Sequence, residues 1–357
     1  MDKIFKLFED NHNFKIGKLL GKGGFGEVRE IKMNGKTYAG KLVKMKHKND
    51  INGKKEDNIL LYLKSPNIVK IHKIFNEKYN NNGIEETYNL IIMEKSVLKN
   101  LNSFNKYLVN MKKYTIINNP FNEEIGDNLL KFFCRQIVNA LELLDRNELI
   151  HFDIKPENIL IFLELSLKLS DFGLLKDVSQ AKNIKIPGGT PGYMSPEFFS
   201  YKSKKIPIDM AKKQDYFALG ATIYLLKYGR LMIKVNKSED DIIKQENIID
   251  IIQREIVFIK SNIVGDKDFV KFLCSLIQIL PEDRPSFEEI YRNKWINKDS
   301  DYLSKLVKIT GDDEEKLIME LKKSDYLFEK ERYFEKSQNK RNKFVLSNKI
   351  FKYKLKK

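Results

Sequence analysis

Asp153, Lys155, Asn158 and Asp171 form a closely spaced set of polar residues with apolar sequence around them. The Asp153 carboxylate can accept a proton from a hydroxyl nucleophile, and the Lys155 ammonium can stabilise a phosphoryl group during its transfer. The amide oxygen of Asn158 and, thirteen residues later, the carboxylate of Asp171 suit Mg²⁺ as ligands. The spacing therefore predicts metal-assisted transfer of a phosphoryl group to a hydroxyl.

A glycine-rich segment near the N-terminus has the composition of a phosphate-binding loop. Its glycines lie between two runs expected to be strands, and no helix begins at the third glycine of the pattern, which argues against a dinucleotide-binding fold. Backbone amides in such a loop can donate to phosphate oxygens, while Val28 would cover an adenine ring. The residues expected to touch the nucleotide here are Leu20, Gly21, Lys22, Gly23, Gly24, Phe25, Gly26 and Val28.

Lys41 ends a strand-like run thirteen residues after Val28. A buried ammonium at this position would neutralise the α and β phosphates of a nucleotide. Glu56 opens a predicted helix, 56–63, from which its carboxylate could hold the Lys41 ammonium in place. The two residues are therefore predicted to form an ion pair beside the phosphates.

Two kinds of structure are expected to position these residues. Residues 14–94 contain short apolar alternations, an Asn34–Gly35 hairpin signal and the one predicted helix, which together predict a small twisted antiparallel sheet. The Asn-rich stretch 76–87 is expected to be a surface insertion. From residue 129 onward apolar residues recur at helical spacing, and 215–226 is apolar nearly all round, as in a buried helix.

The fold class that follows is α+β, in four segments. These are an N-terminal extension, a sheet lobe with one helix, a mainly helical lobe, and a charged helical tail that ends in a basic stretch. Their expected bounds are 1–13, 14–94, 95–297 and 298–357.

The composition restricts the class of protein. The chain has 357 residues, 42% of them hydrophobic, which is enough to bury a substantial core. The first ten residues mix charged and apolar side chains, unlike a secretory signal, and no window resembles a membrane span. Cys134 and Cys274 each stand alone, which excludes a disulfide framework and predicts a reducing cytoplasmic or nuclear setting.

The order of these motifs resembles that of the eukaryotic protein kinase family, over roughly Phe14 to Ile296. The resemblance implies a bilobal kinase fold, ATP with Mg²⁺, and transfer of the γ-phosphoryl group to a hydroxyl of a protein substrate. Lys155 and the segment 189–192 resemble the serine/threonine branch. In this register Thr190 would hydrogen-bond near Asp153 and shape the substrate site.

The resemblance also assigns roles to residues that spacing alone does not mark. Met93 would be the gatekeeper, the hinge from Glu94 to Ser96 would bind adenine, and Ala39 and Leu160 would help to enclose the ring. Leu60, His151 and Phe172, the last within Asp171–Phe172–Gly173, would stack into a hydrophobic column. Asp215 would anchor the catalytic loop, and Arg284 would pair with Glu197 at the end of the activation segment.

Phe152 departs from the family pattern, because most regulated kinases carry arginine before the catalytic aspartate. That arginine receives a phosphate from the activation segment, a contact that phenylalanine cannot make. Between Asp171 and Thr190 only Ser179 bears a hydroxyl. We therefore expect activity without phosphorylation of this segment, unless Lys176 or Lys182 replaces the missing arginine.

Much of the positive charge lies in the last 22 residues. The formal charge is +16, and residues 336–357 carry nine basic side chains and no acid, which leaves +7 for the rest of the chain. Apolar residues between these basic ones favour packing on the kinase body or a partner; docking on an acidic surface such as a cytoskeletal polymer is the second interpretation, and nucleic-acid binding is the least favoured. The alternative function is a kinase-fold structural or docking protein that acts through this tail.

Overall fold

The computed structural model describes residues 1–24, 26–45, 59, 61–96, 99–110, 123–162, 165–201, 204–234, 245–261 and 266–297. The fold and the site belong to one compact unit, 1–162 with 166–302. The predicted positions Phe25, Glu56 and Leu60 and the predicted tail, 298–357, lie outside the described residues.

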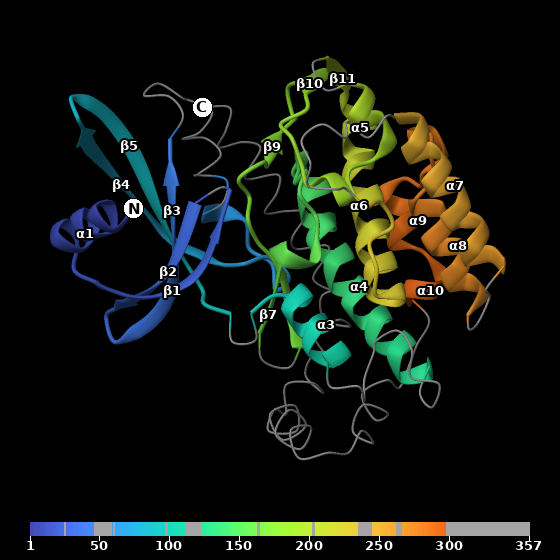
Figure 1. Ribbon diagram of the computed structural model, residues 1–357, viewed down its shortest axis with the longest axis horizontal. Helices are drawn as coiled ribbons and strands as arrows, with labels where there is room; N and C mark the ends of the chain where they lie inside the picture. The colour runs from blue at the N-terminus through green and yellow to red at the C-terminus, as the bar shows by residue number, and fades with distance from the viewer. Residues whose placement is uncertain are drawn as a thin grey trace. The chain divides into compact units, whose positions relative to one another are not determined.

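A five-stranded antiparallel sheet forms the N-terminal part of this unit (Figure 1). Its strands are β1 (Lys15–Gly23), β2 (Gly26–Met33), β3 (Lys36–Lys44), β4 (Ile71–Asn81) and β5 (Ile84–Met93), in the spatial order β1-β2-β3-β5-β4. Asn34 and Gly35 join β2 to β3 with positive φ angles of 51° and 71°, as the Asn-Gly signal predicted. The antiparallel sheet is therefore confirmed.

The stretch 76–87, expected to be a surface insertion, is part of a paired hairpin. β4 and β5 pair continuously through it, from Ile71↔Met93 to Asn81↔Ile84. The turn lies at Asn82–Gly83, where both φ angles are positive. Asn is uncommon in strands, but here cross-strand pairing outweighs that preference.

Alternation along the strands gives the sheet two different faces. On β3, Ala39 and Lys41 point to one face, and Gly40 and Leu42 to the other. A Cβ atom at Gly40 would lie 2.5 Å from Cγ1 of Ile31, so only glycine fits at that crowded point. Leu42 thus belongs to an apolar core, and Lys41 lies on the opposite face of the sheet.

Helix α1 (Asp2–Asn11) covers the apolar face (Figure 1). Its three buried side chains, Ile4, Phe5 and Phe8, follow helical spacing and join a core with strand residues. The strand members of this core, with the residue that precedes β1, are Phe14, Ile31, Leu42, Phe75, Tyr88, Leu90 and Ile92. Helix α1 is therefore part of the core of the sheet lobe.

The C-terminal part of the unit is mainly helical, as predicted. Its helices are α3 (Leu101–Asn110), α4 (Glu123–Arg146), α5 (Pro196–Ser200), α6 (Ile208–Tyr228), α7 (Gln245–Ser261), α8 (Lys267–Leu276), α9 (Phe287–Tyr291) and α10 (Lys294–Asn297). Helix α6 packs against α4 and α8 and is buried nearly all round from Gln214 to Tyr224. Among the described residues, none of the helices has the length and apolar character needed to cross a membrane.

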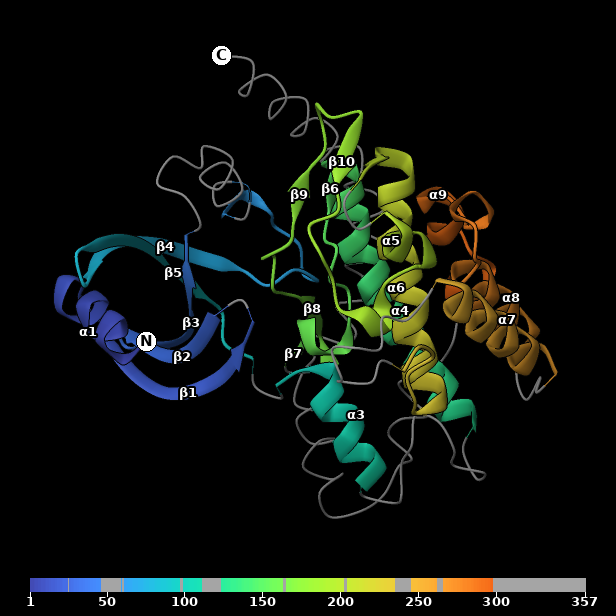
Figure 2. The same ribbon diagram turned by 45° about the horizontal axis from the view of Figure 1, so that its top comes forward.

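In the part of the chain that the structure describes, three short strand pairs lie among these helices (Figure 2). Single turns of 3-10 helix occur in the same part of the chain. The pairs are β6 (Leu149–Ile150) with β9 (Lys176–Asp177), β7 (Ile159–Ile161) with β8 (Leu167–Leu169), and β10 (Asn183–Lys185) with β11 (Lys205–Pro207). The 3-10 turns are η1 (Pro156–Asn158), η3 (Pro191–Tyr193) and η4 (Pro281–Asp283). The loop that carries Asp153 runs from β6 to β7 and is held at both ends.

Candidate active site

The predicted base, Asp153, lies at the centre of a hydrogen-bond network. Its Oδ1 accepts from the hydroxyl of Thr190 (2.7 Å), and its Oδ2 accepts from Nζ of Lys155 (2.6 Å) and Nδ2 of Asn158 (2.9 Å). Burial alone would raise the pKa of Asp153, but these donors outweigh it and hold the pKa below its ordinary value. Asp153 is therefore ionised at neutral pH and able to act as a base.

Lys155 and Asn158 are oriented by the same network. Lys155 Nζ also donates to the Thr190 hydroxyl (2.6 Å), so one ammonium bridges the loop of the base and the activation segment. Asn158 uses Nδ2 for two bonds, to the side chain and to the carbonyl of Asp153 (2.8 Å). Its amide oxygen is therefore the atom that remains to ligate a cation.

The backbone before Asp171 is bonded to the loop that carries Asp153, and the side chain of Asp171 contacts the sheet. Ser170 donates from both N and Oγ to the carbonyl of Asn158 (2.8 Å each), which joins the two predicted metal-binding positions. Asp171 itself has φ +59°, a conformation that non-glycine residues hold only where their surroundings impose it. Its carboxylate forms an ion pair with Lys41 of β3.

The donor set fits Mg²⁺. A carboxylate from Asp171 and an amide oxygen from Asn158 are the hard oxygen ligands that this cation takes, usually with water and phosphate oxygens completing the shell. Lys41 is 9% exposed and projects beside Asp171 from the face of the sheet opposite Leu42. The structure therefore brings together the four polar residues of the sequence motif and Lys41.

The glycine loop and the predicted adenine pocket come from the same face. Gly26 has φ +138°, and a Cβ atom there would lie 2.0 Å from the carbonyl oxygen of Leu42, so this position requires glycine. Val28 and Lys41 are cross-strand partners, as are Ala39 and Met93. The other predicted loop residues, Leu20, Gly21, Lys22, Gly23 and Gly24, form the end of β1 and the turn after it.

The predicted hinge is fixed by side-chain contacts that the sequence did not indicate. Both carboxylate oxygens of Glu94 lie 2.7 Å from Nζ of Lys168 on β8, and the amide of Lys70 donates to one of them (2.7 Å). The hydroxyl of Ser96 donates to the carbonyl of Ile161 on β7 (2.7 Å). The side chains of Glu94 and Ser96 are thus engaged in structural contacts, so adenine binding by the predicted hinge would fall to its backbone.

Leu160, another predicted adenine contact, lies on β7 and forms an isolated bridge with Asn100. This bridge connects the segment after the hinge to the strand pair that follows the catalytic loop. The pairing could not be expected from the sequence, since the strands are only three residues long.

The catalytic loop is anchored from inside the helical lobe by Asp215 of α6. Its two carboxylate oxygens accept from the amides of His151 (2.7 Å) and Phe152 (2.9 Å). Burial lowers the pKa of His151, so the neutral ring accepts the amide of Asp153 on Nδ1 and donates from Nε2 to the carbonyl of Ser170 (3.0 Å). This tautomer follows from the two contacts.

The ring of His151 also contacts Phe172, edge to face, with centroids 5.4 Å apart. Two of the three residues predicted for the hydrophobic column are therefore in contact. Gly173 follows, and its amide donates to Asp171 Oδ1 (3.3 Å).

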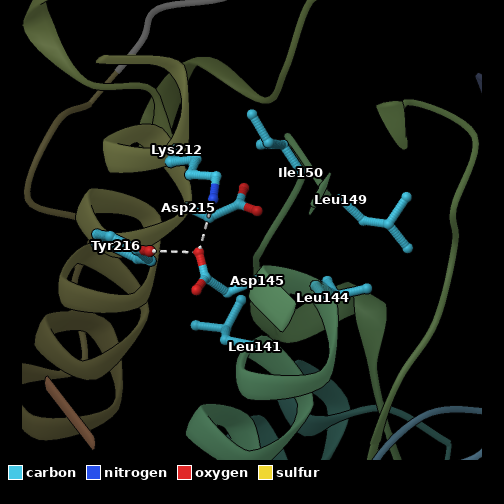
Figure 3. A pocket seen from close by; sticks show the side chains of 8 residues that line it. All are labelled: Leu141, Leu144, Asp145, Leu149, Ile150, Lys212, Asp215 and Tyr216. Atoms are coloured by element: carbon cyan, nitrogen blue, oxygen red, sulfur yellow. Dashed lines mark hydrogen bonds and ion pairs between the residues drawn. The ribbon is translucent and has the colours of Figure 1, made fainter. Parts of the chain in front are cut away.

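Behind the loop, a small hollow between α4, β6 and α6 lies next to Asp215 (Figure 3). In it Asp145 accepts from Nζ of Lys212 (3.1 Å) and from the hydroxyl of Tyr216 (3.3 Å). Asp215 is buried, and burial raises its pKa to about 7, against the opposing effect of the two amide donors. The anchor therefore titrates near neutrality.

Arg284 and Glu197 form a buried, bidentate ion pair. The distances are 2.6 Å from Nη1 to Oε1 and 2.7 Å from Nη2 to Oε2, and Arg284 is 2% exposed. The hydroxyl of Ser195 lies 2.7 Å from both Glu197 Oε1 and Gln214 Oε1. Sequence reasoning missed Gln214, whose polar side chain within a buried helix was the available signal.

Phe152 occupies an apolar cluster between the catalytic loop and the activation segment. It has φ +65° and is 1% exposed. Its buried neighbours come from the segment before Asp153, the activation segment, α5, β11 and α6: Ile150, Leu174, Val178, Ile186, Met194, Phe198, Ile206 and Ala211. Apolar packing thus connects the elements that a phosphate-binding arginine would otherwise join.

Ser179 lies outside this cluster. It is exposed, and its hydroxyl donates to the carboxylate of Asp177 (2.6 Å). Lys176 and Lys182 were the two residues that could replace the missing arginine. Lys176 belongs to β9, and Lys182 precedes β10.

Comparison with known proteins agrees with this geometry. Residues 14–296 match the family described as protein kinase domain. The serine/threonine-protein kinase DCLK3 of Mus musculus is 28% identical over 295 residues, 80% of this chain and 33% of that protein. The serine/threonine-protein kinase atg1 of Dictyostelium discoideum is 27% identical over 297 residues, 80% of this chain and 39% of that protein.

The serine/threonine-protein kinase mrck-1 of Caenorhabditis elegans is 26% identical over 289 residues, 77% of this chain and 16% of that protein. The chain therefore spans less than half the length of each of these relatives. The matched region includes the sheet, the catalytic loop, Asp171, Glu197 and Arg284. With its bilobal architecture and this match over most of its length, the chain belongs to the protein kinase domain family.

Proposed function

We propose that this chain is an ATP-dependent serine/threonine protein kinase. The observation that carries the proposal is the bonding of Asp153, whose carboxylate is held ionised between Lys155, Asn158 and the Thr190 hydroxyl. A base in such a position takes the proton of a substrate hydroxyl as that oxygen attacks phosphorus. The family uses ATP and Mg²⁺, and the residues of the site fit both.

Each charged group has a distinct part in the proposed reaction. Lys155 places an ammonium beside the base, where it stabilises negative charge on the transferring group. Lys41 projects from β3, where it would hold the nucleotide phosphates, and Asn158 and Asp171 would hold Mg²⁺. When bound, the cation would neutralise the charge that develops on the phosphate oxygens.

The preference for serine or threonine rests on the contact between Lys155 and Thr190 (2.6 Å). This contact closes one side of the space next to Asp153 and favours a short aliphatic hydroxyl over a phenol. Peptides that differ only in serine, threonine or tyrosine at the acceptor test it, and equal transfer to tyrosine would contradict it.

The experiment for the activity compares wild type, Asp153→Asn and Asp250→Asn with Mg²⁺-ATP and a mixed peptide library. Asp153→Asn should lower kcat by roughly 10²–10⁴-fold, the usual contribution of a general base. Asp250 is exposed on α7, so its amide variant is the matched control and should transfer phosphate like wild type. Equal activity in all three proteins would overturn the assignment of the base.

We also propose that the basic tail, residues 336–357, docks the kinase on an acidic surface such as a cytoskeletal polymer, in the cytoplasm. Nine basic side chains without an acid support docking, and the two buried free thiols, Cys134 and Cys274, support a reducing setting. Protein lacking residues 331–357 should phosphorylate peptides normally and fail to sediment with polymer. Sedimentation of both forms would contradict docking, and recovery of the full chain outside the cytoplasmic fraction would contradict the location.

A further inference from the structure

The strands β10 and β11 form a two-stranded ribbon (Figure 1). Four exposed lysines lie on it or directly beside it. They are Lys182, just before β10, Lys185 on β10, Lys204, just before β11, and Lys205 on β11. Lys185 and Lys205 are direct cross-strand partners. Like charges in this arrangement repel each other and destabilise a strand pair.

No carboxylate within the described ranges forms an ion pair with any of these four lysines. A second lysine pair shows the contrast: Lys15 and Lys32 also face each other, between β1 and β2. There the carboxylate of Glu9 is held beside Lys15 by the amide of Ile16 (3.1 Å), and Glu30 lies two residues from Lys32 on the same face. The β10–β11 lysines lack such compensation among the residues that the structure describes, so an acidic group from another molecule would relieve their repulsion.

The ribbon is continuous with the active site. Ile186, directly after Lys185, is buried in the cluster of Phe152, and Thr190 contacts Asp153. Thr190 is five positions after Lys185, which limits the distance between their Cα atoms to about 18 Å. An extended peptide covers a similar distance, roughly 13–21 Å, in four to six residues.

We propose that these four lysines form a recognition site for acidic protein substrates. A substrate with Asp or Glu side chains four to six residues from the acceptor hydroxyl would place them against Lys185 and Lys205 while the hydroxyl lies at Asp153. The inference rests on the proposed kinase activity and adds the class of substrate to it. The ammonium groups supply attraction without strict geometry, so the site favours acidic charge over one defined sequence.

The test uses three peptides with one acceptor serine: a neutral one, one with three glutamates before the acceptor and one with three glutamates after it, each at a distance of four to six residues. Kcat/KM is measured for wild type, for Lys185→Gln/Lys205→Gln and for the control Lys15→Gln/Lys32→Gln. Wild type should prefer one of the acidic peptides by about tenfold, with less preference at high salt. The ribbon variant should lose most of this preference, and the control should keep it.

Thermal unfolding of both double variants, compared with wild type, checks that they are folded. Wild type that phosphorylates the neutral and both acidic peptides equally would overturn the recognition site and leave the kinase activity intact. Equal loss of the preference in the control variant would also overturn the recognition site, because the preference would then depend on the net charge of the protein and not on the β10–β11 lysines. If the ribbon variant lost binding to a nucleic-acid probe and kept its peptide preference, the lysines would serve a different partner and the proposal would fail.

Discussion

Phe152 and Phe198 lie in contact, with ring centroids 5.9 Å apart and planes tilted by 39°. The first residue immediately precedes the catalytic aspartate, and the second belongs to α5, at the end of the activation segment. The two rings join these elements by apolar packing. Unlike a contact to a phosphate, this packing needs no modification and is present in every folded molecule. We infer that this packing, with Ile186 in the same cluster, holds the activation segment without a phosphate.

Phe152→Leu tests this role. The smaller side chain should destabilise the protein by roughly 0.5–3 kcal/mol and lower kcat/KM for peptide at a temperature where it remains folded, because the activation segment loses packing. Phe269→Leu, buried in α8 far along the chain from this segment, is the matched control. It should lose stability in urea unfolding and keep its kcat/KM; parallel loss of activity in both variants would contradict the specific role.

Ser179→Ala should leave kcat/KM unchanged, since the hydroxyl is exposed and contacts only Asp177 among the described residues. Peptide assays of phosphatase-treated protein provide the measurement. Inactive Ser179→Ala protein would show that phosphorylation of this segment is required.

Thr190→Val removes a hydroxyl that contacts Asp153 and Lys155. It should lower kcat/KM in the same peptide assays about 10- to 100-fold, in line with 1.5–3 kcal/mol for a hydrogen bond to a charged group.

The stability of the protein should depend on pH through Asp215. Its pKa is about 7 in the folded protein because the group is buried, and near 4 in the unfolded chain. The folded protein binds more protons than the unfolded chain between these values, so the contribution of this group to stability falls as pH rises from about 4 to about 7.

Asp215→Asn removes this titration. The free energy of unfolding of wild type, relative to that of Asp215→Asn, should therefore decrease between about pH 5 and pH 7, by up to about 1.4 kcal/mol per pH unit. Urea unfolding of the two proteins at several pH values measures the difference. Parallel pH profiles would show that Asp215 is already ionised across this range.

Phe8→Ala should destabilise the protein by about 3–5 kcal/mol, because the ring of Phe8 is fully buried between α1 and the sheet. Ile84→Ala is the control, since that side chain is 68% exposed at the tip of the β4–β5 hairpin and should change stability by roughly 0.5 kcal/mol or less. Thermal unfolding distinguishes them. Similar unfolding temperatures for Phe8→Ala and wild type would mean that the packing of α1 on the sheet contributes little to the stability of the protein.

Local signals in the sequence predicted the elements that local chemistry decides. The Asn34–Gly35 turn and the apolar helix α6 are examples, because each depends on residues within a few positions of one another. The polar residues of the site could be found because their order and spacing are characteristic of one chemistry. The hairpin at 76–87 was missed because its Asn residues have low strand propensity and its stability comes from pairing.

Contacts between distant residues could not be predicted in this way. The pairing of Glu94 with Lys168 and the bonds of Gln214 around Ser195 depend on how separate elements meet in space. The attachment of α1 is similar: the spacing of Ile4, Phe5 and Phe8 is helical, but the sequence does not say which surface they cover.

Helix α1 lies outside residues 14–296, the part of the chain that matches the family. A fragment trimmed to those residues would keep every catalytic motif described above and leave one face of its sheet, with Leu42, Leu90 and Ile92, without the side chains that cover it. Such a fragment is expected to aggregate through this face. Poor activity of the trimmed protein would therefore measure the loss of its solubility, and would say nothing about Asp153 or its neighbours.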